Sequence, residues 1–134
     1  MSFEFLSHTA DIRMRVRART LAELFREAAE GMFELLNAKI KMQNAKLRKI
    51  SISSQDETSL LIDFLNELLA FAQIHKEAYD VFKFTTFTPT SLQAEVEGMQ
   101  LEEFSEDIKA VTYHEAEVRQ NEKGEWETIV IFDI

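Results

Sequence analysis

The sequence contains no cysteine, one proline and three glycines among its 134 residues. The absence of cysteine excludes disulfide bonds and thiolate zinc sites, so a bound metal would need carboxylate, carbonyl, imidazole or water ligands. The scarcity of glycine excludes the Walker and dinucleotide-binding loops, which cradle phosphates with glycine-rich backbone. No motif presents a nucleophile together with a partner base. Signs of an active site are therefore few.

Long hydrophobic runs are also missing. No apolar stretch approaches the roughly 18 residues that a membrane-spanning helix needs, and the opening MSFEFLSHTAD has no basic cluster before an apolar run, unlike a secretory signal. We therefore expect a soluble, cytoplasmic protein without membrane contact. With 46% hydrophobic residues, a chain of this length suits a single domain over residues 1–134.

Positive charge is in short supply over most of the chain. The net charge is −9, from 15 Lys and Arg and 24 Asp and Glu, so strong direct binding to a nucleic acid backbone is not expected. Residues 1–50 hold ten Lys and Arg against six Asp and Glu, whereas the remainder hold five against eighteen. This asymmetry predicts separate charged faces or partners.

The chain does contain regular helix and strand patterns. Residues 12–18 alternate apolar residues with arginines, which predicts a strand with one buried face. Residues 20–36 predict an amphipathic helix, because they open with a capping box of Thr20 and Glu23 and place apolar residues on one helical stripe. Residues 55–75 predict a second amphipathic helix, capped by Asp56 or a nearby serine. Further strands are expected at residues 46–53, 80–87, 91–98, 109–118 and 126–134, with an acidic connection at 99–107 and a hairpin turn around Asn121 and Gly124.

The order of these elements defines the expected fold class. Two strands, a helix, a strand and a second helix are followed by four strands, without internal repeats or linkers. This order predicts an α+β fold in which two amphipathic helices pack on a mainly antiparallel β-sheet.

The ending, EWETIVIFDI, carries a carboxylate that composition would not predict. Asp133 shares strand parity with Ile129 and Ile131, which would place its ionised side chain on an apolar face. The chain-end carboxylate of Ile134 is its neighbour, and two adjacent negative charges repel more strongly as water is excluded. One interpretation is a hard cation such as calcium or magnesium between them, since such ions take oxygen ligands. The alternative is that the last two residues extend into solvent.

Two further aspartates are candidates for function. Asp11 ends the HTAD stretch just before a predicted strand, where aspartate is commonly a turn former that bonds nearby backbone amides. Asp63 lies in the second predicted helix, one turn before Glu67. The simplest interpretation of that acidic pair is a helix face exposed to solvent.

The basic side chains also allow more than one interpretation. The three histidines are too far apart in sequence for a local metal motif: His8, His75 and His114. We expect His114 to be a hydrogen-bonded packing residue of a strand. The strand at 12–18 and the residue after it carry an arginine stripe, composed of Arg13, Arg15, Arg17 and Arg19. The stripe would suit carboxylates or phosphates on a partner, or it would protect the sheet against aggregation.

Five separated blocks carry a family resemblance. They are FLSHTADIRMRV, TLAELFREAAEGMFELL, LLIDFLNELL, KAVTYHEAEV and the terminal WETIVIFDI. In this order, and over nearly the whole length, the chain resembles the archease family. The resemblance implies an archease-like α+β fold with two helices against a curved sheet, which agrees with the pattern of elements.

The resemblance implies a function for the chain. It would be a non-enzymatic cofactor of the RtcB-type RNA ligase, which joins RNA ends in tRNA splicing and RNA repair. Family members promote guanylylation of the ligase by GTP and allow repeated turnover. An alternative is a chaperone-like specificity modulator of another RNA-processing enzyme, such as a tRNA methyltransferase. A third interpretation is an independent metal-dependent hydrolase with Asp11, Asp63 and Asp133 around its cation.

The resemblance also implies a metal site, typically for calcium. Its ligands would be Asp11, Asp133 and the chain-end carboxylate of Ile134. Asp63 and Lys109 match family positions with a functional role, and His8 belongs to the same block as Asp11.

One region departs from the family pattern. Family members commonly have a longer connection with a Lys-His pair before the KAVTYH block, whereas residues 99–108 are short, acidic and lack that pair. A ligase contact or second cation site in this connection is therefore not expected by analogy. The acidic residues could instead present a different face to a basic partner.

Overall fold

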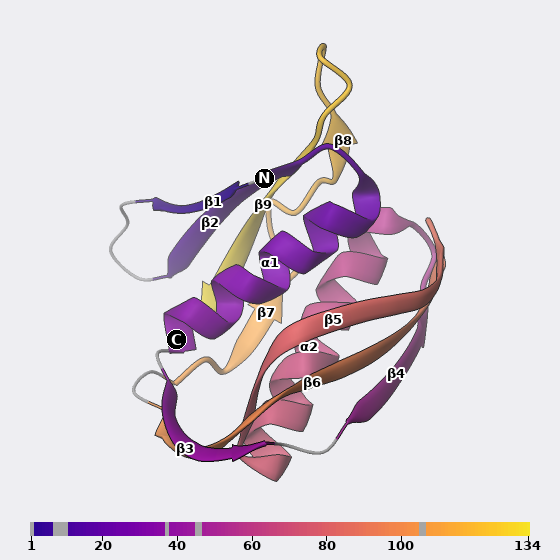
Figure 1. The fold of residues 1–134 in the computed structure, drawn as a ribbon. Helices are drawn as coiled ribbons and strands as arrows, with labels where there is room; N and C mark the ends of the chain where they lie inside the picture. Colours follow the sequence, from indigo (N-terminus) through magenta and orange to yellow (C-terminus); the bar gives the residue numbers. More distant parts are fainter. Residues whose placement is uncertain (1, 7–10, 37, 45–46, 105–106) are drawn as a thin grey trace.

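The computed structural model describes residues 2–6, 11–36, 38–44, 47–104 and 107–134. Within these ranges the chain forms two helices and nine strands (Figure 1). Their bounds are β1 (Ser2–Leu6), β2 (Ile12–Ala18), α1 (Leu21–Leu36), β3 (Ala38–Asn44), β4 (Arg48–Ser53), α2 (Glu57–His75), β5 (Glu77–Thr88), β6 (Ser91–Phe104), β7 (Ala110–Thr112), β8 (Arg119–Gln120) and β9 (Trp126–Asp133).

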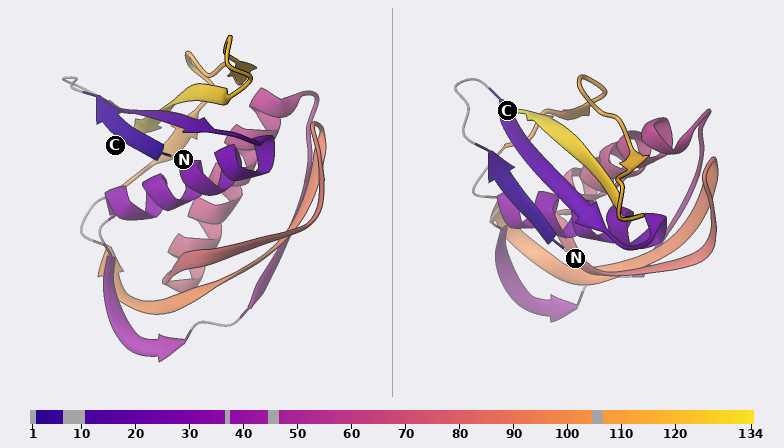
Figure 2. Two further views of the ribbon diagram at one scale, coloured as in Figure 1. Left: turned by 45° about the horizontal axis from the view of Figure 1, so that its top comes forward. Right: turned by 90° about the horizontal axis from the view of Figure 1, so that it is seen from above.

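The strands form two antiparallel sheets with the helices between them. The first sheet has the order β1-β2-β9-β7, with β8 also paired to β9. In the second sheet β6 pairs with β5 along one edge and with β3 and β4 along the other. Helix α1 contacts β2 and β5, and α2 contacts β7 and β4, so each helix touches both sheets (Figures 1 and 2). The predicted α+β class is confirmed, but two sheets replace the single sheet.

The two helices lie close to their predicted bounds. At the start of α1, the Glu23 N–H donates to Thr20 Oγ1 at 3.1 Å, as in a capping box. At the start of α2, the Ser59 N–H donates to the Asp56 carboxylate at 2.7 Å, and Lys76 ends the helix with a left-handed φ of 54°. Helix α2 buries apolar side chains around much of its circumference because sheets lie on both sides of it.

Two strand predictions are wrong in extent. Strand β6 continues through most of the segment that was expected to be an acidic connection, because β3 pairs with its last residues. The sequence pattern did not predict β3. The segment 109–118 forms only the short strand β7, because the chain turns at Glu115, whose φ is 58°.

Gly98 lets β5 and β6 approach each other closely. A Cβ atom at this position would lie 1.9 Å from the carbonyl oxygen of Ala78. The pairing between these strands is irregular between Tyr79 and Val81, directly opposite this point. Both strands curve strongly around the helices (Figure 2), and the glycine permits the backbone contact at the irregularity.

The core is one cluster of buried side chains that includes residues of both helices and both sheets. Its aromatic contacts connect the layers: Phe25 of α1 stacks on Phe64 of α2 with ring centroids 5.9 Å apart, and Phe33 of α1 meets Tyr79 of β5 edge to face at 5.5 Å. Within the described ranges, neither helix has the length and apolar character needed to cross a membrane.

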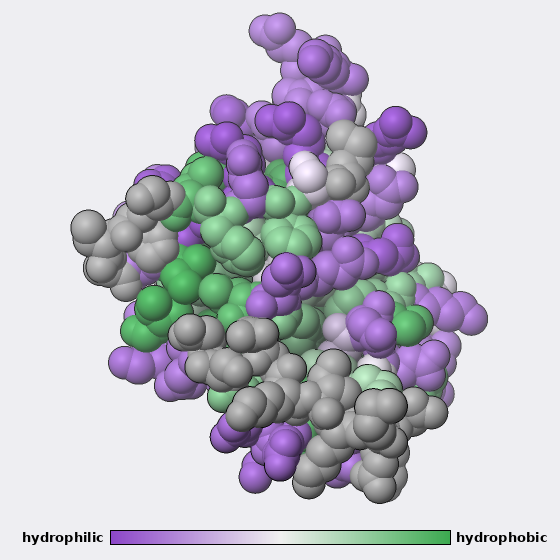
Figure 3. All heavy atoms as spheres, turned by 60° about the vertical axis from the view of Figure 1, so that its left-hand side comes forward, coloured by the Kyte–Doolittle hydropathy of each residue, from purple (hydrophilic) through white to green (hydrophobic). Residues whose placement is uncertain are grey.

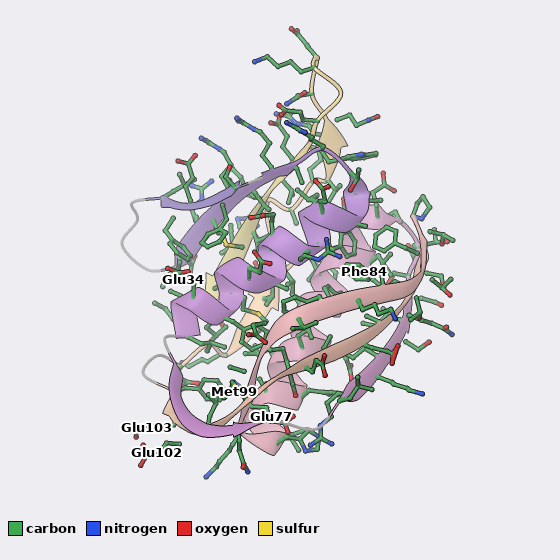
Figure 4. The ribbon with its side chains drawn as sticks, viewed as in Figure 1. Glu34, Glu77, Phe84, Met99, Glu102 and Glu103 are labelled. Atoms are coloured by element: carbon green, nitrogen blue, oxygen red, sulfur yellow. The ribbon has the colours of Figure 1, made fainter. Side chains whose placement is uncertain are left out.

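A buried ion pair connects β4 and β5. Glu77, labelled in Figure 4, is only 4% exposed and accepts two hydrogen bonds from Arg48 at 3.0 Å each and one from the Tyr79 hydroxyl at 2.8 Å. Burial alone would raise the pKa of Glu77, but the hydrogen bonds from Arg48 and Tyr79 outweigh it and lower the pKa. The carboxylate is therefore ionised in the interior because it is fully paired.

Candidate metal-binding site at the end of the first sheet

The predicted ligands lie at one end of the first sheet, where its neighbouring strands β2, β9 and β7 meet. Strand β2 begins at Ile12, opposite Phe132 of β9, and β7 begins at Ala110, opposite Asp133. The next position along the β2–β9 register places Asp11 opposite Asp133, since residues paired across antiparallel strands advance in opposite directions. Figure 2 shows the chain end beside the start of β2. Residues that are 122 positions apart thus meet where the last strand ends.

The backbone just before the last residue is fixed. The Lys109 N–H donates to the main-chain carbonyl of Asp133 at 2.7 Å, which continues the β7–β9 ladder by one bond. The peptide group that precedes Ile134 is therefore anchored, and the terminal residue extends beyond the last ladder bond.

The candidate carboxylates are accessible to solvent. Asp11 and Asp133 are exposed, and Ile134 is 41% exposed. The expectation that Asp133 is buried on an apolar face is wrong: Ile131 is buried, but Asp133, the last residue of β9, is exposed. Burial therefore gives no reason for a cation here, and the remaining reason is the mutual repulsion of neighbouring carboxylates.

The donor set fits a hard cation. Two aspartates and a chain-end carboxylate supply oxygen atoms only, which suits calcium or magnesium, and both ions fill remaining coordination positions with water or partner groups. Among the residues that the structure describes, no three His, Asp or Glu side chains gather closely enough to hold a metal by themselves. The predicted ligand set also includes the terminal carboxylate.

Asp63 lies at the other end of β7. Its Oδ2 accepts a hydrogen bond from the Ser54 hydroxyl at 2.6 Å, and its Oδ1 accepts one from the Tyr113 hydroxyl. Tyr113 follows β7, whereas Asp133 pairs with Ala110 at the beginning of that strand. Asp63 therefore does not join Asp11 and Asp133. It lines a shallow hollow of about 440 Å³ with Asn66, Glu67 and residues 51–53.

The other predicted basic residues have different surroundings. Lys109 is exposed beside Asp133, whereas His8 lies outside the described residues. The prediction that His114 packs in a strand is wrong, because its side chain is 78% exposed, with Nε2 3.9 Å from a Glu115 oxygen.

Three of the four arginines of the stripe form ion pairs within the chain. Its ion pairs are Arg13 with Glu115 at 2.9 Å, Arg15 with Glu4 at 3.0 Å and Arg17 with Glu127 at 3.6 Å, and Arg119 also lies 3.6 Å from Glu127. These side chains alternate with buried residues of β2, as predicted. Because carboxylates of the chain oppose Arg13, Arg15 and Arg17, these three side chains offer little net positive charge to a phosphate.

Residues 99–104 of the acidic segment that departs from the family pattern form the end of β6. Glu102 and Glu103 project from this strand (Figure 4) and, with exposed Asp107, line a hollow of about 510 Å³. Buried Leu36 and Leu101 contribute its apolar part.

Figure 3 shows another face of the molecule, where hydrophobic side chains gather among hydrophilic ones. Phe5 and Ile134, each 41% exposed, are among the large apolar residues of the molecular surface.

Sequence reasoning missed a set of polar side chains on α2 that contact the backbone of residues 108–118. Thr58, Asn66 and Gln73 make these contacts. A signal was available, since Asn66 interrupts a run of apolar residues in a predicted helix. The pattern alone did not name its partner, because that partner is distant in sequence.

The fold and the site together define a class of small α+β proteins. In this class two helices lie between antiparallel sheets, and aspartates meet where the last strand ends. The chain belongs to the archease family: residues 3–134 match the family described as Archease protein family (MTH1598/TM1083). This confirms the resemblance seen in the sequence.

Relatives are similar over nearly their whole length. The archease protein of Methanothermobacter thermautotrophicus is 33% identical, with 98% of each chain covered, and that of Methanosarcina barkeri is 31% identical, with 98% of this chain and 95% of the relative covered. The solution structure of Methanobacterium thermoautotrophicum protein 1598 matches with a TM-score of 0.70 at 30% identity, covering 98% of both chains. An archease crystal structure from Thermotoga maritima, described as a possible chaperone, has the same fold, with a TM-score of 0.70 at 18% identity and coverage of 96% and 94%.

Proposed function

We propose that this chain is a non-enzymatic accessory protein of an RtcB-type RNA ligase. It promotes GTP-dependent guanylylation of the ligase and lets each ligase molecule act repeatedly in tRNA splicing and RNA repair. The proposal is supported by membership of the archease family and by the meeting of Asp11 with Asp133 at the chain end. In this proposal a divalent cation, with calcium as the leading candidate, binds Asp11, Asp133 and the carboxylate of Ile134.

The residues of the chain would act by holding ligands in place. Asp11 directly precedes β2 and Asp133 ends the neighbouring strand β9, so the sheet restrains their spacing. The Lys109 N–H restrains the carbonyl that precedes the terminal carboxylate. When bound, the cation would supply positive charge that oxygen atoms of a phosphate or a partner carboxylate can share. All these groups are exposed, so the site suits docking onto a partner.

The test is product formed per ligase molecule, with GTP, a divalent cation and phosphate-ended RNA. We expect many turnovers only when this chain is added. Asp133→Ala should abolish the stimulation and leave the circular dichroism spectrum unchanged, because Asp133 is exposed at the end of its strand.

A matched control variant removes one negative charge, as Asp133→Ala does, but at a position away from the site. Glu122→Ala also removes one exposed carboxylate, from the turn before β9 at the opposite end of that strand, and should leave stimulation intact. Unchanged ligation with Asp133→Ala would contradict the metal-site proposal. No stimulation by the wild-type chain would contradict the ligase proposal itself.

A second candidate function is a chaperone-like modulator of another RNA-processing enzyme, such as a tRNA methyltransferase. It is favoured by the description of the Thermotoga maritima archease as a possible chaperone. This role predicts a stoichiometric complex and a changed oligomeric state of the enzyme, both visible by light scattering after size-exclusion chromatography. A ligase that forms at most one product per molecule in the presence of the chain would favour this second role.

A further inference from the structure

Strand β7 is an edge strand whose outer side is occupied by a side chain of α2. Among the residues that the structure describes, β7 pairs with no strand other than β9. On its other side, Asn66 Nδ2 donates to the Val111 carbonyl at 2.8 Å, and the Val111 N–H donates to Asn66 Oδ1 at 2.9 Å. The carboxamide thus pairs with both backbone groups of one residue, as a neighbouring strand would. Val111 is only 2% exposed, so water cannot replace Asn66 without structural change.

Further side chains of α2 contact the same segment. Gln73 Nε2 donates to the Ile108 carbonyl at 3.0 Å, and the Val118 N–H donates to Thr58 Oγ1 at 2.9 Å. The second amide proton of Asn66 is used within the helix, on the Ile62 carbonyl at 3.1 Å. The donors and acceptor of the Asn66 amide are therefore all engaged.

Two of these contacts flank the residue that restrains the chain end. Ile108 precedes Lys109 and Val111 follows it by two positions, and the Lys109 N–H donates to the Asp133 carbonyl at 2.7 Å. Ala110 pairs with Asp133 and Val111 with Phe132. Helix α2 therefore fixes β7, and β7 fixes the last ladder bonds of β9.

We propose that Asn66 and Gln73 are positioning residues for the chain end, and through it for the proposed cation site. The cation part of this inference rests on the proposed function. Neither side chain contacts the cation; each holds the strand that sets the place of Asp133 relative to Asp11. Groups that orient a metal ligand in this way commonly change metal affinity when they are removed.

The test uses the full chain, calcium chloride and titration calorimetry. Asn66→Leu has similar volume, favours the helix and cannot bond Val111, so we expect calcium affinity to fall about tenfold. Thr58→Val is the matched control, since it removes a bond from the same helix to the same segment, but at Val118, beyond the turn at Glu115. It should change the affinity less than about twofold.

A second readout is independent of the metal. Hydrogen exchange of the Lys109 amide, followed by NMR, reports the bond to the Asp133 carbonyl directly. It should be faster in Asn66→Leu than in wild type and unchanged in Thr58→Val. If Asn66→Leu does not fold, Gln73→Leu replaces it, because Gln73 is exposed and its substitution is tolerated more easily.

The outcomes separate this inference from the proposed function. If the wild-type chain does not bind calcium, the proposed cation site fails, and Lys109 exchange still decides whether α2 positions the chain end. Equal exchange in the Asn66 and Thr58 variants would overturn the positioning role. An equal loss of calcium affinity in both variants would also overturn it, because general destabilisation would then account for the effect.

Discussion

At the scale of single residues, the contact between Asp63 and Tyr113 changes the pKa of the tyrosine, which can be measured. The hydroxyl of Tyr113 donates to Asp63, and Ser54 donates to the other carboxylate oxygen. The hydrogen bond to Asp63, with partial burial, raises the pKa of Tyr113 to about 12. Burial, together with Glu77, raises the pKa of Tyr79 as well. Both tyrosines of the chain are therefore held in their neutral form.

We predict that the wild-type chain shows no tyrosinate absorbance step near pH 10. Asp63→Asn removes the negative charge that opposes ionisation of Tyr113, so one tyrosine should then titrate near its usual pKa of about 10. Ultraviolet absorbance between neutral and alkaline pH measures this step. Tyr113→Phe in the Asp63→Asn background is the control and should remove it. An unchanged titration curve in Asp63→Asn would contradict the assigned contact.

Residue patterns predicted only part of the candidate site. Asp11 and Asp133 were marked by the family resemblance, and their meeting follows from the β2–β9 register, which a local pattern does not contain. The chemistry of the ending suggested a cation for two reasons, and the exposure of Asp133 removes one of them, the burial of its charge. Asn66 was missed because its partner, Val111, is 45 residues away.

At the scale of elements, local patterns predicted both helices and most strands of the second sheet, but they missed β3 and the last part of β6. Both helices have caps and apolar stripes, which are local signals. Strand β3 and the last part of β6 stabilise each other through pairing over a long sequence distance, and the acidic residues there resemble a loop. The division into two sheets likewise depends on long-range partners.

Gly98 gives a prediction at this scale. Gly98→Ala should lower the free energy of unfolding by about 3 kcal/mol, because the new Cβ atom would meet the Ala78 carbonyl oxygen and force β5 away from β6. Urea denaturation followed by circular dichroism measures the change. Gly124→Ala is the control: Gly124 has a φ of 79° but open space around it, so the cost should be about 1 kcal/mol. Equal costs at the two positions would show that backbone conformation, and not the close approach, sets the requirement for glycine.

At the scale of the whole molecule, charge is distributed by faces. Three arginines of the stripe, Arg13, Arg15 and Arg17, face glutamates of other parts of the chain. The hollow beside the end of β6 is lined by acidic side chains, and the chain as a whole has a net charge of −9. From this net charge we predict a basic protein partner and no strong binding to a nucleic acid backbone.

A prediction for the whole chain concerns its length. In the proposed site the carboxylate of Ile134 is a ligand, so one glycine added after Ile134 would move that carboxylate by about 3.5 Å. Calcium affinity, measured by calorimetry, should fall at least about tenfold while the thermal unfolding midpoint stays the same. One glycine added before Met1 is the control with equal mass. Full calcium affinity in the extended chain would exclude the terminal carboxylate as a ligand.

The contacts between α2 and the segment 108–118 also limit how this fold can vary in length. Thr58, Asn66 and Gln73 meet that segment at fixed intervals along the helix. Inserting or deleting one residue between Thr58 and Gln73 would turn the rest of the helix by about 100° and separate at least one side chain from its backbone partner. Insertions and deletions should therefore be tolerated in the turn at residues 121–124 but not inside α2. The length of this helix is fixed by its backbone partners, whereas the remaining loops can lengthen or shorten.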